Sequence, residues 1–297
     1  MTIDRRQFLK LGALGGGAVL ASSLAGCAGM ARGALEEDFY FVQLSDTHWG
    51  FNGPALNPDA RGTLPKAIAA VNALEVQPDF IVFTGDLTHT TDDGVERRKR
   101  LAEFKQIASG LKNRNVRFMA GEHDASLDNG AAWKELFGPT YYAFDHKGVH
   151  FVAIDNVSDP AARIGEEQLA WLAADLGKQP KDARIVVLTH RPLFDLAPAW
   201  DWATRDGAQA IELLMPHPNV TVFYGHIHQE HHHMTGHIAH HSAKSLIFPL
   251  PAAGSQPKRD PIKWDASQPY KGLGFREVEA EAKGAKYGIT ELAVVKG

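Results

Sequence analysis

The sequence predicts an α/β protein with a largely parallel or mixed central sheet. Short apolar runs of Val, Ile, Phe, Leu and Thr alternate with longer amphipathic segments along most of the chain. Such runs are typical of strands buried on both faces, and their alternation with helical segments is the pattern of an α/β fold. Polar residues follow several runs directly, at the carboxyl ends of the strands, where open α/β sheets bind their ligands.

Residues 1–38 are expected to be an export signal and a tether, outside the fold. Arg5 and Arg6 precede a Gly- and Ala-rich apolar segment at residues 11–25. This pattern resembles a twin-arginine signal, by which the Tat machinery exports folded proteins. The segment is too short for a comfortable transmembrane helix, which needs about 20 apolar residues. We therefore expect a protein of the periplasm or cell envelope.

Cys27 is expected to be the lipidated first residue of the mature protein. It follows Leu24-Ala25-Gly26 and completes a lipoprotein-type processing box behind the apolar segment. A lipid there would anchor the protein to a membrane. The alternative is cleavage at a neighbouring small residue, with Cys27 incidental. Because the chain has one Cys, an internal disulfide is excluded in any compartment.

From residue 39 to residue 297 we expect a single domain of strands, helices and hairpins. Strands that end in polar residues are predicted within 39–48, 79–89, 116–124, 184–192 and 219–228. Helices are predicted at 64–74, 95–111, 166–176 and 207–215, with the charged run at 96–100 as the solvated face of the second. Hairpins are predicted at 141–156, 231–251 and 272–295, and a Pro-rich loop at 249–270.

Composition excludes one class of partner and singles out one residue type. The net charge of −4 argues against nucleic acid, because a surface that follows phosphates needs a basic excess. The chain contains 15 His, and they gather near one hairpin. This His-rich hairpin is expected either to bind a third metal ion or to be an exposed edge without a ligand; its residues are His231, His232, His233, His237, His240 and His241.

Metal is the natural partner for the side chains at the five strand ends. A single strand end with Asp or His would say little about function, because both residues are common in turns. Burying many carboxylates and imidazoles at one edge of a sheet costs free energy unless cations pair with them. The number of donors exceeds the needs of one ion. It suits two ions about 3.5–4 Å apart that share a bridging carboxylate.

The ordered motifs at these ends resemble those of the calcineurin-like metallophosphoesterases. They are Asp46-Thr47-His48, Gly85-Asp86, Gly121-Glu122-His123-Asp124, His190 and Gly225-His226-Ile227-His228. The resemblance extends over residues 39–228, in order and with fitting spacing. It implies an α/β fold whose core is a two-sheet β-sandwich flanked by helices.

The resemblance also implies a role for each residue. Asp46, His48 and His228 would hold one metal ion, Asp86 would bridge, and Glu122, His190 and His226 would hold the second; the ions would be Mn, Fe or Zn, divalent or of mixed valence. A hydroxide between them would attack phosphorus in line with the leaving oxygen. His123 would bind a phosphoryl oxygen or protonate the leaving group. Asp124 would orient that imidazole or cap a helix.

Glu122 departs from the family pattern, which has Asn at this position. Glu can ligate a metal, but an ionised carboxylate cannot donate a hydrogen bond to substrate. It also lowers the charge of the site by one unit. Three interpretations follow. A trivalent ion such as Fe³⁺ restores the charge, the substrate is a phosphodiester or another weakly charged ester, or the site binds metal with much reduced phosphatase activity.

These observations favour an exported phosphoesterase that acts on a small phosphate ester, with a phosphodiester preferred over a monoester. The alternative is an envelope protein that binds metal through the same site and the His-rich hairpin, with little or no turnover. His89 is a further candidate for the site or a loop histidine. Trp200 and Trp202 could form a wall for the leaving group, although ordinary packing is the simpler expectation.

Overall fold

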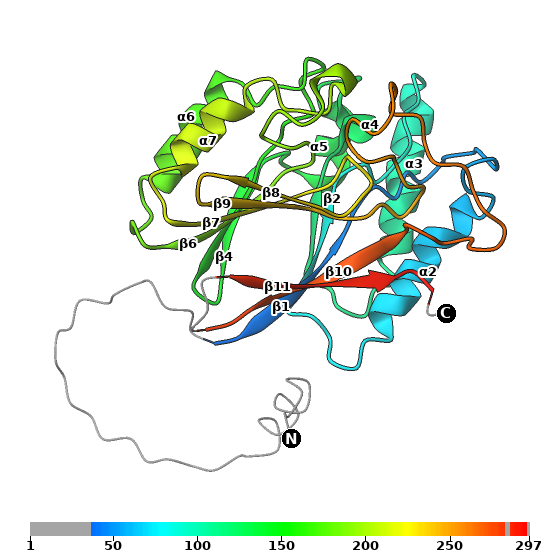
Figure 1. Ribbon diagram of the computed structural model, residues 1–297, viewed down its shortest axis with the longest axis horizontal. Coiled ribbons are helices and arrows are strands. Elements are labelled where there is room, and N and C mark those ends of the chain that lie inside the picture. Colours follow the sequence, from blue (N-terminus) through cyan, green and yellow to red (C-terminus); the bar gives the residue numbers. More distant parts are fainter. Residues whose placement is uncertain (1–36, 283–285, 296–297) are drawn as a thin grey trace, which may run out of the picture. The chain divides into compact units, whose positions relative to one another are not determined.

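The computed structural model describes residues 37–282 and 286–295 of the 297-residue chain. The expected export signal, Cys27 and the tip of the last predicted hairpin lie outside these residues. Two β-sheets pack face to face, and helices cover their outer faces (Figure 1). The predicted two-sheet α/β architecture is therefore confirmed.

The first sheet has five strands in the order β11-β10-β1-β2-β3. Its parallel strands are β1 (Phe39–Leu44), β2 (Phe80–Thr84) and β3 (Val116–Met119). The antiparallel hairpin of β10 (Gly274–Ala280) and β11 (Tyr287–Ala293) pairs with β1 at its edge. This is the closing hairpin that the sequence predicts, and it extends the sheet on the side opposite β3.

The second sheet has six strands in the order β4-β5-β6-β7-β9-β8. Its parallel strands are β5 (Val149–Ala153), β6 (Arg184–Leu188), β7 (Asn219–Tyr224) and β9 (Ile238–Ser242). Antiparallel edge strands are β4 (Tyr142–His146) and β8 (His231–Thr235). Both predicted hairpins in this part of the chain are confirmed.

The helices bury apolar stripes against the outer faces of the sheets. On the first sheet lie α2 (Ala60–Asn72), α3 (Gly94–Ala108) and α5 (Ala131–Phe137). On the second lie α6 (Glu166–Leu176) and α7 (Gly207–Leu214). The four predicted helices occur close to their expected bounds. Two short segments, α5 and the single turn α4 (Glu122–Ala125), were not predicted because their apolar pattern is too brief for a helical period.

The charged run at the start of α3 is not simply a solvated face, as the sequence suggested. Arg97 is buried, and its guanidinium contacts Asp128 at 2.8 Å and donates to the carbonyl of Thr91. Arg100 donates to the carbonyl of His89. Both arginines therefore hold the loop that follows β2, through hydrogen bonds to residues 6 and 11 positions away in the sequence that a periodicity argument does not reveal.

Aromatic rings fill the space between the two sheets. Phe41 of β1 stacks on Phe80 of β2 with ring centroids 4.9 Å apart. Edges of Phe151 and Phe223, from the second sheet, meet the ring of Phe41 at 5.9 and 5.6 Å. All four side chains are fully buried. Since the neighbours of Phe41 along β1 face the helices, this strand is buried on both sides, as its apolar sequence predicts.

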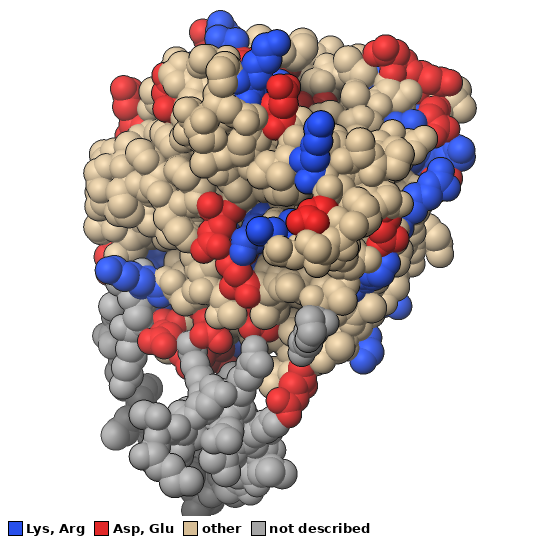
Figure 2. All heavy atoms as spheres, turned by 45° about the vertical axis from the view of Figure 1, so that its right-hand side comes forward, with Lys and Arg blue, Asp and Glu red and all other residues tan. Residues whose placement is uncertain are grey.

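On the face shown in Figure 2, acidic and basic side chains are interspersed, and neither sign forms a continuous patch there. Within the described residues, no helix has both the length and the apolar character needed to cross a bilayer.

Truncation of Phe41 tests the packing of the two sheets. Phe41→Ala should lower the free energy of unfolding by about 3–5 kcal/mol, because it opens a cavity between rings that cannot all collapse inward. Equilibrium urea unfolding followed by circular dichroism measures the change. Val95→Ala is the control: Val95 is 79% exposed on α3, and its truncation should change stability by less than about 0.5 kcal/mol. A loss below about 1 kcal/mol for Phe41→Ala would contradict this account of the core.

Candidate functional site

The ends of strands from both sheets converge on one site. Donors that follow β1, β2 and β3 meet donors that follow β6 and β7. Their atoms form two groups in which each donor lies within 4.8 Å of the others: Asp46, His48, Asp86 and His228 in the first, and Asp86, Glu122, His190 and His226 in the second. The structure thus brings together all seven residues expected to bind metal, and Asp86 is common to both groups.

The backbone at several donors has a conformation that L-residues rarely adopt. Positive φ angles of 44–67° occur at Asp46, His48, Asp86, His226 and His228. A left-handed conformation costs such a residue about 1–2 kcal/mol, and it persists only where the surroundings enforce it. Here the N–H of Asp46 donates to the carbonyl of Gly85 at 3.0 Å, and that of His48 to the carbonyl of Asp86 at 2.9 Å. The loops after β1 and β2 therefore hold each other in the strained form that aims the donors inward.

Glycines before the donors permit close approach of the chain. A Cβ at Gly85 would lie 2.3 Å from Nδ1 of His190, and one at Gly121 would lie 2.1 Å from Oδ1 of Asp86. Both separations are far below van der Waals contact. The glycines of the Gly-Asp and Gly-Glu-His motifs are thus required for steric reasons. Any side chain at either position would displace a donor that follows another strand.

Backbone carbonyls fix which nitrogen of two histidines faces the site. Nδ1 of His190 donates to the carbonyl of Thr84 at 2.7 Å, and Nδ1 of His228 donates to the carbonyl of Phe248 at 2.8 Å. Nε2 of each ring therefore faces the site and offers a lone pair to a metal ion when the ring is neutral. Nε2 of His48 lies 3.2 Å from Nε2 of His228. Two imidazole nitrogens facing each other in this way suit a shared cation.

Glu122 lies between two imidazoles of the second group. Its carboxylate oxygens are 2.8 Å from Nε2 of His190 and 2.8 Å from Nδ1 of His226. Burial favours the neutral carboxyl, but the imidazoles of His226 and His190 outweigh it and hold the pKa of Glu122 well below its usual range. Glu122 is therefore ionised, and its charge belongs to the site.

The donor set fits a pair of metal ions. Buried Nε2 of His190, both ring nitrogens of His226 and Oε2 of Glu122 have no hydrogen-bond partner of acceptable geometry. Burial lowers the pKa of His190, yet the carboxylates of Asp86 and Glu122 raise it well above the usual value, so the site attracts positive charge. Carboxylate oxygens and imidazole nitrogens are ligands for ions such as Zn²⁺, Mn²⁺ and Fe.

His123 stands at the open side of this site. Its side chain is 26% exposed, and Nε2 lies 3.9 Å from Oδ2 of Asp86. Nδ1 accepts a hydrogen bond from the N–H of Thr90 at 3.1 Å. A nitrogen that accepts a backbone N–H carries no proton, so the ring proton is on Nε2. His123 can therefore donate a hydrogen bond to a substrate oxygen from this nitrogen.

Asp124 has the capping role and lies away from the ring nitrogen of its neighbour. Its buried carboxylate accepts N–H groups of Gly121, Leu87 and Thr88 at 2.8–2.9 Å, and the hydroxyl of Thr88 at 2.8 Å. Thr90, not Asp124, bonds to Nδ1 of His123. The hydrogen bonds therefore support the capping role of Asp124 and not the orienting role. Its carboxylate connects α4 to the loop after β2.

Asn156 is a supporting residue that the sequence reasoning missed. It is buried beyond the end of β5; its Oδ1 lies 3.3 Å from the N–H groups of His190 and Arg191, and its Nδ2 donates to the carbonyl of Arg191 at 2.8 Å. It thus fixes the turn that presents His190. The sequence did offer a signal, because Asn156 follows a parallel strand and five other strand ends carry site residues.

The His-rich hairpin of β8 and β9 does not join the site. Among the described residues, every group of three close metal donors excludes its histidines. Instead, they contact protein groups: Nδ1 atoms of His232 and His241 lie 2.6 Å apart, His231 meets the hydroxyl of Tyr224, and the ring of His233 stacks on Phe194. The histidines of this hairpin are therefore separate from the seven donors of the site.

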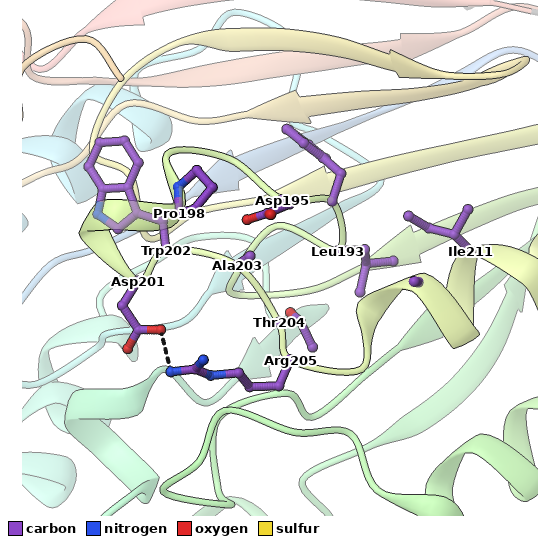
Figure 3. Close-up of a pocket in the computed structure, with 11 residues that line it drawn as sticks. Leu193, Asp195, Pro198, Asp201, Trp202, Ala203, Thr204, Arg205 and Ile211 are labelled. Atoms are coloured by element: carbon purple, nitrogen blue, oxygen red, sulfur yellow. Dashed lines mark hydrogen bonds and ion pairs between the residues drawn. The ribbon is translucent and has the colours of Figure 1, made fainter. Parts of the chain in front are cut away.

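Trp200 and Trp202 pack against each other and do not form an open wall. They are 6% and 1% exposed, with ring centroids 4.7 Å apart in an edge-to-face contact. Trp202 also lines a cavity of about 370 Å³ in the loop after β6, beside the ion pair of Asp201 and Arg205 (Figure 3). None of the seven metal donors lines this cavity, so ordinary packing accounts for both rings.

Several known proteins resemble this chain. It is 29% identical over 205 residues to a probable cyclic nucleotide phosphodiesterase of Rhodococcus erythropolis, an alignment that covers 64% of each chain. The chain therefore spans less than two thirds of the length of that relative. It is 26% identical over 257 residues, 82% of this chain and 86% of the other, to a 3′,5′-cyclic adenosine monophosphate phosphodiesterase of Haemophilus influenzae.

The fold has a counterpart among solved structures. A dimetal phosphatase of Danio rerio superposes with a TM-score of 0.57 at 16% identity, over 88% of this chain and 98% of that one. The family model described as calcineurin-like phosphoesterase matches residues 39–230, the segment that contains all seven donors. Because this match covers more than half of the chain, the protein belongs to the calcineurin-like phosphoesterase family.

Proposed function

We propose that this protein is a dinuclear-metal phosphodiesterase and that its substrate is a small phosphodiester such as a cyclic nucleotide. The observation that carries the proposal is the pair of donor groups joined by Asp86, with Nε2 of His123 facing their open side. The two bacterial relatives named for cyclic nucleotide phosphodiesterase activity support this class of substrate.

The residues of the chain divide the work of hydrolysis. Two bound ions, of Mn, Fe or Zn, would activate a water molecule and neutralise charge on the phosphoryl group. Asp86, which belongs to both donor groups, would help to hold both ions. The N–H of His123 donates to Oδ1 of Asp86 at 2.9 Å, which fixes the bridging carboxylate relative to the imidazole. Nε2–H of His123 would then bind a phosphoryl oxygen or the leaving oxygen.

The charge of Glu122 supports a diester over a monoester. Two divalent ions against Asp46, Asp86 and Glu122 leave a site of about +1, whereas a neutral residue at position 122 would leave about +2. A phosphomonoester dianion loses more attraction from this change than a phosphodiester monoanion does. A trivalent ion such as Fe³⁺ would restore the missing charge, so the metal content bears on the same question.

We also propose export to the periplasm or cell envelope. The proposal rests on Arg5, Arg6, the apolar segment after them and Cys27. A metal site assembled from five separate strand ends forms only in the folded chain, and the Tat route carries folded proteins. Lipidation at Cys27 would anchor the mature protein to a membrane.

Hydrolysis of activated esters by the metal-loaded protein tests the proposal. With Mn²⁺, Fe or Zn²⁺ bound, we expect kcat/KM for bis-p-nitrophenyl phosphate to exceed that for p-nitrophenyl phosphate, and chelation to abolish both activities. A protein that binds metal tightly but turns over neither ester with any of these ions would be the non-catalytic metal-binding protein, and the enzyme proposal would be wrong.

Replacement of His123 separates two roles of its imidazole. His123→Ala should lower kcat/KM about 10²–10³-fold through loss of one hydrogen-bond donor, with metal content unchanged. Because Nδ1 accepts the N–H of Thr90, we expect the imidazole to be neutral and to donate a hydrogen bond without protonating the leaving group. The loss of kcat/KM should therefore be similar for p-nitrophenyl and alkyl leaving groups. A much larger loss for the alkyl ester would show that His123 protonates the leaving group. Loss of metal would show that it is a ligand. The control is His237→Ala, in the exposed turn of the hairpin.

Neutralisation of Glu122 tests the charge argument. Glu122→Asn should raise the ratio of monoesterase to diesterase kcat/KM by about tenfold or more, since one added unit of site charge favours the dianion. Glu122→Gln keeps the side-chain length and should move the ratio in the same direction. An unchanged ratio in both variants, at equal metal occupancy, would discard the explanation of substrate preference by charge.

A further inference from the structure

A third group of imidazoles adjoins the metal donors. His48, His89 and His123 present ring nitrogens within 4.8 Å of one another. His89 follows Asp86 by three residues and is partly buried, and neither donor group includes it. Its ring stacks on that of His123, with centroids 5.0 Å apart and planes inclined by 27°. The position of this histidine therefore connects a metal donor with the residue that faces substrate.

The orientation of His48 determines what His89 does. Nε2 of His48 lies 3.2 Å from Nε2 of His228 and 3.4 Å from Oδ2 of Asp86, so this nitrogen belongs to the first donor group. A neutral imidazole that offers Nε2 to a metal carries its proton on Nδ1. Nδ1 of His48 lies 3.3 Å from Nδ1 of His89. The proton on His48 is thus directed at a lone pair of His89.

Two of the other three donor histidines show the same arrangement with a different acceptor. Nδ1 of His190 and of His228 each donate to a backbone carbonyl, which holds the ring and its tautomer. For His48 the ring of His89 takes the place of the carbonyl. Removal of such a hydrogen-bond partner typically lowers metal affinity about 10–100-fold.

The backbone of His89 is anchored well enough to serve this purpose. Its N–H donates to the carbonyl of Trp49 at 2.9 Å, and its carbonyl accepts from Arg100 at 2.9 Å. The next residue, Thr90, donates its N–H to Nδ1 of His123 and accepts a hydrogen bond from Arg100 through its carbonyl. Residues 89 and 90 thus hold the outer nitrogens of His48 and His123 at the same time.

We propose that His89 is a positioning residue for the metal centre, which fixes the tautomer and orientation of His48 and supports the ring of His123. The proposal rests on the metal centre of the proposed function and not on the identity of the substrate. A third metal ion in this group is the competing explanation. It is less consistent with the contacts, because Nδ1 of His123 already accepts the N–H of Thr90 and Nε2 of His48 faces the first donor group.

Two variants of similar shape isolate the hydrogen bond. In His89→Asn, a carbonyl oxygen can stand near the place of Nδ1, whereas His89→Leu has no acceptor there. Competition with a chromophoric chelator, without substrate, measures the affinity for each of the two ions. We expect His89→Leu to weaken one of them about 10–100-fold, and His89→Asn to stay within about threefold of the wild type. His237→Leu, which removes a histidine from the hairpin turn, should leave both affinities unchanged.

The outcomes that contradict the proposal are distinct from a failure of the proposed function. Equal affinities in the Leu and Asn variants would overturn it, and so would a third ion in the wild type that His89→Leu removes. Nitrogen-15 NMR of the metal-loaded wild type gives an answer that does not depend on the variants folding. A proton on Nδ1 of His48 is expected, and a proton on Nε2 would overturn the proposal. Because these measurements need no turnover, they test the role of His89 independently of whether the protein hydrolyses esters.

Discussion

The concentration of buried ionisable groups at one edge of the two sheets is the constraint on which the site depends. Three carboxylates and four imidazoles form two adjoining groups that share Asp86, and several of their atoms lack hydrogen-bond partners. Desolvated charges of this number are costly unless cations balance them. Bound metal ions therefore stabilise this arrangement. The net charge of the site with its ions bound then affects which phosphate ester binds.

The backbone of the surrounding loops also holds the donors in place. Left-handed backbone at Asp46, Asp86 and His226 turns the chain inward directly after the strands, and glycines at the neighbouring positions let the loops touch. The loop after β2 then holds the parts together, since Thr88 bonds to Asp124 and Thr90 bonds to His123. Such preorganisation fixes ligands in strained conformations that an isolated loop would not keep.

The α/β class and the convergence of the donors were predictable from local pattern, that is, from apolar runs and the polar residues directly after them. The arrangement in two sheets was expected from the family resemblance, because the pattern alone indicates a central sheet. What could not be predicted depends on side-chain contacts that form only when the chain folds. Arg97 and Arg100 read as a solvated charged face, yet they bond to carbonyls of the loop after β2. Asp124 binds backbone N–H groups about 36 residues away in place of the neighbouring ring, and only the folded chain shows this.

We infer that seven donors from five strand ends hold two ions and that Asp86 is shared between them. Anomalous diffraction from crystals of the metal-loaded protein, collected at the absorption edge of the bound element, is the most direct test. Two peaks about 3.5–4 Å apart are expected, one beside Asp46, His48 and His228, the other beside Glu122, His190 and His226, with Asp86 between them. A single peak, or full occupancy only at the His-rich hairpin, would contradict it.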